Sequence, residues 1–177
     1  MRRIALAAVA VAALSAAPAA EARGCGNADL DPANATVQQL RHATVCVLNV
    51  QRRKHGLRRL RQNPGLVLAG QRHAMDMVER RYFSHSSTAG TPFTVRIRRT
   101  GYLRRSGRTL LGENLAYGGR ELGTPRQIVR SWMRSPGHRA NILQPRFREV
   151  GIGVVRRLPV HGMSGATYAA EFGRRHL

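Results

Sequence analysis

Residues 132–143 read WMRSPGHRANIL, and this stretch carries the strongest structural signals in the chain. A serine followed by a proline, as at Ser135 and Pro136, is typical of a helix start, because serine caps the first turn and proline fits its first position. We therefore expect a short helix with His138 in its first turn. The positive end of the helix dipole disfavours protonation there, which leaves a neutral imidazole suited to binding a metal ion.

Ser135 lies three residues before His138, a spacing that could also indicate a serine nucleophile beside its base. The proline directly after Ser135 favours the capping role, and the chain has no G-x-S-x-G motif of the kind that presents a catalytic serine. The preceding helix carries Trp132, the only tryptophan, which we expect to be a core residue.

Capping and periodicity signals predict the other helices. Thr36 opens the first of them with a capping box completed by Gln39, and Gly56 is typical of its end. Further helices are predicted over residues 66–81, over residues 92–100 and from residue 125 onward.

Two strands are predicted near the end of the chain, over residues 150–155 and 166–172, and we expect them to pair in an antiparallel manner. Because the helices come first and the strands last, the pattern indicates an α+β domain.

The first 22 residues are typical of a secretory signal peptide. Two arginines precede an apolar stretch that is too short to span a bilayer, and Ala20-Glu21-Ala22 resembles a cleavage site. An uncleaved anchor is the alternative interpretation. We therefore expect a secreted or cell-envelope protein with no transmembrane segment in the mature chain, a turn-rich leader over residues 23–35 and one domain over residues 36–177.

The chain has two cysteines, Cys25 and Cys46. A single cysteine pair in an exported protein favours a disulfide, and two free buried thiols are the alternative.

The formal net charge is +21, and Lys54 is the only lysine among 30 basic residues. Such a surface attracts polyanions, although heavy arginine use can also reflect genome composition. The arginines are scattered along the sequence and only 5% of residues are aromatic, which argues against a stacking platform for single-stranded nucleic acid. We expect no specific nucleic-acid partner.

Two more positions carry chemistry that the helices do not explain. His85 follows a predicted helix, where it could face a cavity or simply lie on the surface. Glu113 lies in an apolar run, and an acid that is buried there needs a partner or a raised pKa. These residues and His138 are 28 and 25 positions apart, so no single helix gathers them. Gathered by a fold, they would suit metal binding or acid–base chemistry. His73 lies on an apolar helix face, and we interpret it as a hydrogen-bonded core residue.

Four ordered blocks resemble the CAP superfamily, which comprises cysteine-rich secretory proteins, antigen 5 and plant pathogenesis-related group 1 proteins. The blocks read YFSH at residues 82–85, GENLA at 112–116, WMRSPGHRANIL at 132–143 and VGIG at 150–153. The chain is most similar to the secreted bacterial branch, the SCP-domain proteins, over about residues 40–175.

The resemblance implies an α-β-α sandwich, in which helices flank a central antiparallel sheet on both sides. It also implies a surface cleft in which His85, Glu113 and His138 meet as candidate ligands of a divalent metal such as zinc, or of a small ligand. Some members of the family bind metal in this cleft and some bind lipids or sterols elsewhere, while assigned enzymatic activity is rare.

We interpret the chain as a secreted, monomeric binding module rather than an enzyme, because its ligand set lacks a recognisable nucleophile. One alternative is a metal-dependent hydrolase of cell-wall polymer or peptide, in which zinc on His85 and His138 activates water and Glu113 is the third ligand or the general base. Another is adhesion to polyanions through the arginine-rich surface. The expected partners are a cell-wall polymer, an anionic lipid or a small hydrophobic ligand.

Overall fold

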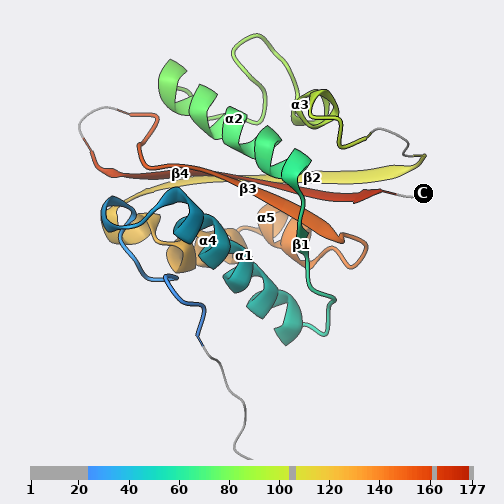
Figure 1. The fold of residues 1–177 in the computed structure, drawn as a ribbon, viewed down its shortest axis with the longest axis horizontal. Helices are drawn as coiled ribbons and strands as arrows, with labels where there is room; N and C mark the ends of the chain where they lie inside the picture. The colour runs from blue at the N-terminus through green and yellow to red at the C-terminus, as the bar shows by residue number, and fades with distance from the viewer. Residues whose placement is uncertain (1–23, 104–106, 161–162, 176–177) are drawn as a thin grey trace, which may run out of the picture.

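A four-stranded sheet with helices on both faces makes up the part of the chain that the computed structural model describes, residues 24–103, 107–160 and 163–175 (Figure 1). The strand order is β1-β3-β4-β2, with bounds β1 (Arg61–Gln62), β2 (Thr109–Gly119), β3 (Glu149–Val155) and β4 (Gly165–Arg175). The central strand β4 pairs antiparallel with β2 and β3, while the two-residue β1 runs parallel to β3. The expected α-β-α sandwich is confirmed, with one short parallel pair added to its antiparallel sheet.

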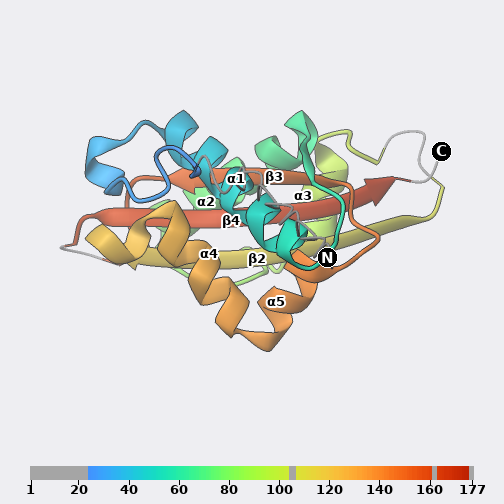
Figure 2. The same cartoon turned by 90° about the horizontal axis from the view of Figure 1, so that it is seen from below.

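The helices form two layers. On one face lie α1 (Val37–Lys54), α4 (Pro125–Arg134) and α5 (Pro136–Leu143), and on the other lie α2 (Pro64–Arg80) and α3 (Phe93–Arg99) (Figures 1 and 2). Two short 3-10 helices, η1 (Pro32–Asn34) and η2 (Arg120–Gly123), complete the set. None of the helices in the described residues is long and apolar enough to cross a membrane. The predicted signal peptide lies outside the described residues.

Most of the local signals act as predicted. Thr36 caps α1, where its side chain accepts from the backbone N–H of Gln39 and the Gln39 side chain accepts from Thr36 in return. Ser135 is the N-cap residue of α5 by its place in the backbone, although its side chain makes no capping hydrogen bond. Trp132 is 1% exposed and donates its indole N–H to the carbonyl of Leu115 at 2.9 Å.

One strand departs from the sequence prediction. The sequence predicts strands only after the helices, whereas β2 lies between α3 and α4 and carries Glu113. Four consecutive residues of β2, Gly112 to Leu115, are buried, so the strand has no alternation of apolar and polar residues at its centre. The period-2 signal of a half-buried strand is therefore missing from its sequence.

Helix α2 rests directly on the sheet. A Cβ atom at Gly151 would lie 2.1 Å from the carbonyl carbon of Leu66, and one at Gly153 would lie 2.1 Å from that of Gly70. A Cβ at Gly70 would lie 2.7 Å from the carbonyl oxygen of Ala169. Only glycine leaves room for this approach, which explains why glycines alternate with apolar residues in β3.

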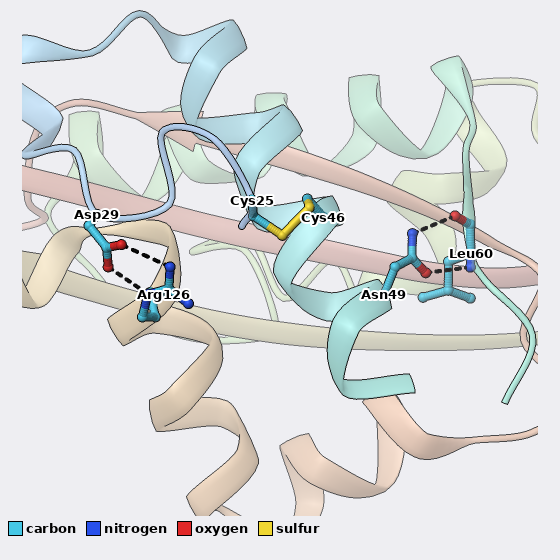
Figure 3. Close-up of a disulfide and its surroundings, with 6 residues drawn as sticks. All are labelled: Cys25, Asp29, Cys46, Asn49, Leu60 and Arg126. Atoms are coloured by element: carbon cyan, nitrogen blue, oxygen red, sulfur yellow. Dashed lines mark hydrogen bonds and ion pairs between the residues drawn. A yellow bond between two sulfur atoms is a disulfide. The ribbon is translucent and has the colours of Figure 1, made fainter. Parts of the chain in front are cut away.

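Residues 24–35 pack against the helices of the α1 face. Ala28 and Ala35 are buried in the main core, and Arg126 of α4 donates two hydrogen bonds to Asp29, of 2.6 and 2.8 Å (Figure 3). The expected disulfide between Cys25 and Cys46 is confirmed, and it joins this segment to the middle of α1 (Figure 3).

Replacing both cysteines by serine is predicted to lower the free energy of unfolding by about 3 kcal/mol, because the bridge closes a loop with a sequence separation of 21 residues. Urea denaturation followed by circular dichroism measures this change. Reducing the native protein should produce the same loss. An unchanged midpoint in the double variant would contradict the prediction.

Candidate functional site

The buried carboxylate of Glu113 lies at the centre of a polar cluster. Its Oε1 accepts a hydrogen bond of 2.7 Å from Nδ1 of His85, and its Oε2 accepts one of 2.5 Å from the guanidinium of Arg96. Nε2 of His73 lies 4.0 Å from the same Oε2. The Glu113 side chain is 0% exposed, so both of its oxygens are held by protein groups away from solvent.

The edge position of β2 lets both helix layers reach this cluster. Neighbouring residues of a strand point to opposite faces, so Glu113 points toward α2 while Asn114 points toward α5. The amide of Asn114 donates to the backbone carbonyl of His138 at 3.0 Å, and the amide of Asn141 donates to the backbone carbonyl of Glu113 at 3.1 Å. His85 and His138 therefore come to the edge of β2 from opposite sides of the sheet.

The contact with Glu113 determines the tautomer of His85. Because Glu113 is an acceptor, Nδ1 of His85 carries the proton, and Nε2 has a free lone pair whenever the ring is neutral. The side chain is 58% exposed. The hydrogen bond to Glu113 raises the pKa of His85 above its ordinary value, against a smaller lowering by burial. Arg96 also donates to the backbone carbonyl of His85 at 2.8 Å, which holds the loop after α2 in place.

His138 lies half-buried in the first turn of α5, as the sequence predicts. Burial lowers its pKa, and the positive charge of His85 lowers it further. The two imidazoles are thus close enough to influence each other's charge. The direction of the shift agrees with the expected neutral ring, although burial is the main cause.

His73 is the satisfied core histidine that the sequence predicts. It is 1% exposed, and its Nε2 donates to the backbone carbonyl of Ser84 at 2.9 Å. Burial lowers its pKa, and the charge of Arg96 adds to this effect. A neutral His73 therefore forms the inner wall of the cluster.

A second glutamate, Glu171, lies beside Glu113 and was not identified from the sequence. It is paired with Glu113 across the β2–β4 ladder and with Gly151 across the β3–β4 ladder, on the face that α2 covers. Glu171 is 0% exposed, and neither carboxyl oxygen has a hydrogen-bond partner among the described residues. A charged residue inside the apolar segment of residues 168–172 was the available sequence signal.

The two glutamates have opposite pKa shifts. Burial and the charge of Glu113 raise the pKa of Glu171 well above its ordinary value. Burial also raises the pKa of Glu113, but the hydrogen bond from His85 and the charge of Arg96 outweigh it, so the net shift is downward. Adjacent carboxyl groups cannot both ionise cheaply in a buried site, so Glu113 is the charged member and Glu171 the protonated one.

Arg96 was also missed, because an arginine on the short helix α3 resembles the many surface arginines of this chain. Its side chain is only 11% exposed, and it supplies the positive charge that neutralises Glu113. Only the packing of α3 against α2 and the sheet distinguishes it from its neighbours.

The cluster differs from a closed metal site. No group of three His, Cys, Asp or Glu side chains within residues 24–103, 107–160 and 163–175 is arranged to hold a metal ion. The groups left for a ligand are Nε2 of His85 and the ring of His138. Two surface hollows, of about 420 and 340 Å³, are lined by other residues, among them Val160 and Met163 in the first and Thr94 and Leu111 in the second.

Comparison with known sequences agrees with this architecture. The sequence model of the cysteine-rich secretory protein family (CAP) matches residues 45–157. The uncharacterized protein YkwD of Bacillus subtilis is 33% identical over 141 residues, which are 79% of this chain and 49% of that protein. The uncharacterized membrane protein YlbC of the same species is 33% identical over 109 residues, which are 62% of this chain and 30% of that protein. The chain thus spans about half the length of YkwD and less than a third of YlbC.

Solved structures show the same fold. An extracellular SCP-domain protein from Bacillus anthracis superposes with a TM-score of 0.62 at 27% identity, covering 78% of this chain and 40% of that one. An outer surface protein of Borrelia burgdorferi has a TM-score of 0.62 at 21% identity, covering 75% of this chain and 90% of that one, and shows the fold alone.

The α-β-α sandwich, with two histidines brought to one strand edge around a glutamate, defines this molecule as an SCP-type domain. The matches over residues 45–157 then place it plainly: the chain belongs to the cysteine-rich secretory protein family. The resemblance seen in the four sequence blocks is confirmed.

Replacing Glu113 by glutamine is predicted to lower the pKa of His85 toward that of a free histidine, because the hydrogen bond from a charged carboxylate is the main cause of its upward shift. An NMR titration of the imidazole resonances measures this change. The resonances of His42, an exposed histidine of α1, serve as the internal control and should be the same in both proteins. An unshifted His85 would contradict the assigned contact.

Replacing Glu171 by glutamine is predicted to stabilise the protein at neutral pH. In the unfolded chain Glu171 loses its proton near pH 4.5, whereas in the folded protein it keeps the proton to a higher pH. The free energy of unfolding therefore falls as the pH rises from about 4.5 toward the pKa of Glu171 in the folded protein. The variant should gain at least about 1 kcal/mol, or roughly 2–4 °C in melting temperature, at pH 7 and less at pH 4.

Glu149→Gln is the matched control for Glu171→Gln. Arg175, Tyr102 and Asn63 lower the pKa of Glu149 against the effect of burial, so this substitution should destabilise the protein at neutral pH. Melting temperatures measured as a function of pH distinguish the expected stabilisation by Glu171→Gln from the expected destabilisation by Glu149→Gln. Equal destabilisation by both substitutions at neutral pH would contradict the prediction for Glu171.

Proposed function

We propose that this protein is a secreted binding module whose site at the edge of β2 binds a divalent metal ion or a small polar ligand through His85 and His138. The observation that carries the proposal is the hydrogen bond of 2.7 Å between Glu113 and Nδ1 of His85. A carboxylate on one ring nitrogen orients the imidazole and makes the other nitrogen a better ligand. Glu113 thus acts as a positioning residue for His85 rather than as a ligand itself.

The surrounding groups support this division of roles. Arg96 keeps Glu113 ionised and oriented, and the protonated Glu171 behind it adds no second negative charge. His138 has a lowered pKa and is neutral at physiological pH, which is the form that binds a metal. Two imidazoles with solvent access fit zinc when water completes its coordination, and bound zinc would act as a Lewis acid there.

The same contacts give less support to the hydrolase alternative. A catalytic zinc normally has three protein ligands, and Glu113 would have to release His85 or Arg96 to become the third. As a general base it has the wrong pKa, because its charged form is already stabilised by both partners. Binding without turnover is the function that the geometry supports best.

Secretion is part of the proposal. Three observations support it: the apolar segment within residues 1–22, the disulfide between Cys25 and Cys46, and the similarity to a solved SCP-domain protein described as extracellular. A disulfide persists in oxidising compartments outside the cytosol.

Zinc titration of the protein by isothermal calorimetry tests the site. We expect one ion per chain, at least tenfold weaker binding in His85→Ala and in His138→Ala, and roughly 10–100-fold weaker binding in Glu113→Gln. Lowering the pH should weaken zinc binding, because protonation of His85 removes the lone pair that binds the ion. Because the pKa of His85 is raised, this loss should begin at a higher pH than for a free histidine.

His42→Ala is the matched control for the zinc titration, because it removes an exposed histidine of α1. Undetectable zinc binding in the native protein, or equal binding in all variants, would exclude the metal site. Mass spectrometry of small molecules that copurify with the exported protein would then test the small-ligand form of the proposal.

A further inference from the structure

One end of the molecule collects a large share of its positive charge. Three segments meet there: the end of α1 with the following loop (residues 52–61), the end of α5 with the loop to β3 (residues 139–149), and the last residues of β4 (residues 173–175) (Figure 1). Together they contain eleven basic side chains and one carboxylate, Glu149. We call these three segments the basic end.

Backbone and side-chain hydrogen bonds hold the three segments together. The N–H of Arg61 donates to the carbonyl of Arg148 at 3.0 Å, and the N–H of Arg148 donates to the carbonyl of Gly173 at 3.1 Å. Asn49 of α1 exchanges two hydrogen bonds with the backbone of Leu60, of 2.7 and 3.0 Å (Figure 3). The basic end is therefore a defined surface that the packing of three elements creates.

A buried positive charge lies beneath this surface. Arg52 is 0% exposed, and its guanidinium donates only to backbone carbonyls, those of Arg58, Ile142, Gln144 and Phe147. Among the residues that the structure describes, no carboxylate forms an ion pair with it. The charge of an arginine persists even when buried, so Arg52 adds a permanent positive potential under the loops.

The surface arginines above Arg52 also lack acidic partners. Arg58, Arg148 and Arg174 form no ion pair with the described carboxylates, and Glu149 is already engaged by Arg175, Tyr102 and Asn63. Burial and repulsion by Arg174 and Arg58 lower the pKa of Arg148, which indicates that both of these arginines lie near Arg148. Grouping like charges costs free energy that a bound anion would recover.

We propose that the basic end is a binding site for a linear phosphate-bearing polymer, held through Arg58, Arg148 and Arg174. Guanidinium groups bind phosphate through paired hydrogen bonds, a geometry that they also offer to carboxylate. The charges extend over three segments, which suits a chain of phosphates better than a single ion. Phe147 is the only phenylalanine, tyrosine or tryptophan of the basic end and is 2% exposed, so the exposed His55 is the one ring there on which a nucleobase could stack.

Fluorescence anisotropy with labelled inorganic polyphosphate tests this site in the full mature protein. We expect binding that weakens steeply with salt. The triple variant Arg58→Gln, Arg148→Gln and Arg174→Gln should bind at least tenfold more weakly at 0.1 M salt. Its slope of log affinity against log salt should be smaller by about 2, at roughly 0.7 per lost phosphate contact on a single chain.

Arg72→Gln, Arg99→Gln and Arg130→Gln together make the matched control, because these exposed arginines on other surfaces remove the same charge. The control should retain most of the affinity. Arg148 donates to the carbonyls of Pro145 and Phe147, so the double variant Arg58→Gln and Arg174→Gln is included to keep the loop intact. It should lose affinity without a change in melting temperature.

Further binding experiments identify which phosphate-bearing partner is bound and whether it binds at the basic end or at the histidine site. Duplex DNA should bind in proportion to its phosphates without sequence preference, and His85→Ala and His138→Ala should bind polyphosphate normally, so this result is independent of the zinc titration. No polyphosphate binding, equal losses in the two triple variants, or preference for phosphatidylglycerol vesicles over polyphosphate would overturn the proposal.

Discussion

The contact between α2 and the sheet is the constraint on which the candidate site depends. Gly70 of the helix and Gly151 and Gly153 of β3 bring the two backbones so close that no side chain fits between them. The helix covers the face of the sheet on which Glu113 and Glu171 lie. In the strand register Glu171 is paired with Glu113 on one side and with Gly151 on the other. A looser helix would admit water, and a buried carboxyl pair would then lose the strong coupling that separates its pKa values.

The electrostatics of the site follow from that dry environment. Two adjacent carboxyl groups share one negative charge, and Arg96 and His85 favour placing it on Glu113. The charge in turn orients His85 and raises its pKa, while His138 stays neutral on the other side of β2. The site is therefore asymmetric: one histidine is fixed by a carboxylate, and the other is positioned through the backbone by Asn114 and Asn141.

Local signals in the sequence predicted a large part of this architecture. Capping patterns located the starts of α1, α4 and α5, the two C-terminal strands were recognised by their composition, and the single cysteine pair is bridged as expected. β2 was not recognised, because its centre is buried on both faces and has no period-2 pattern. Glu113 was selected because its sequence neighbours are apolar. The structure explains these neighbours: Glu113 lies in the buried centre of β2, where its side chain is covered by a helix.

The sequence by itself determined most of the helices, the two C-terminal strands and the family, and it selected His85, Glu113 and His138 as candidate site residues, because short motifs and nearest-neighbour preferences carry that information. Only the tertiary structure decided that Glu171 stands opposite Glu113, that Arg96 rather than another arginine neutralises the site, and that scattered basic residues gather at one end. Each of these depends on strand register or on the packing of segments dozens of residues apart, for example the hydrogen bonds from Arg52 to Ile142 and Phe147. Such contacts are set by the burial of the whole core, and no local pattern encodes them.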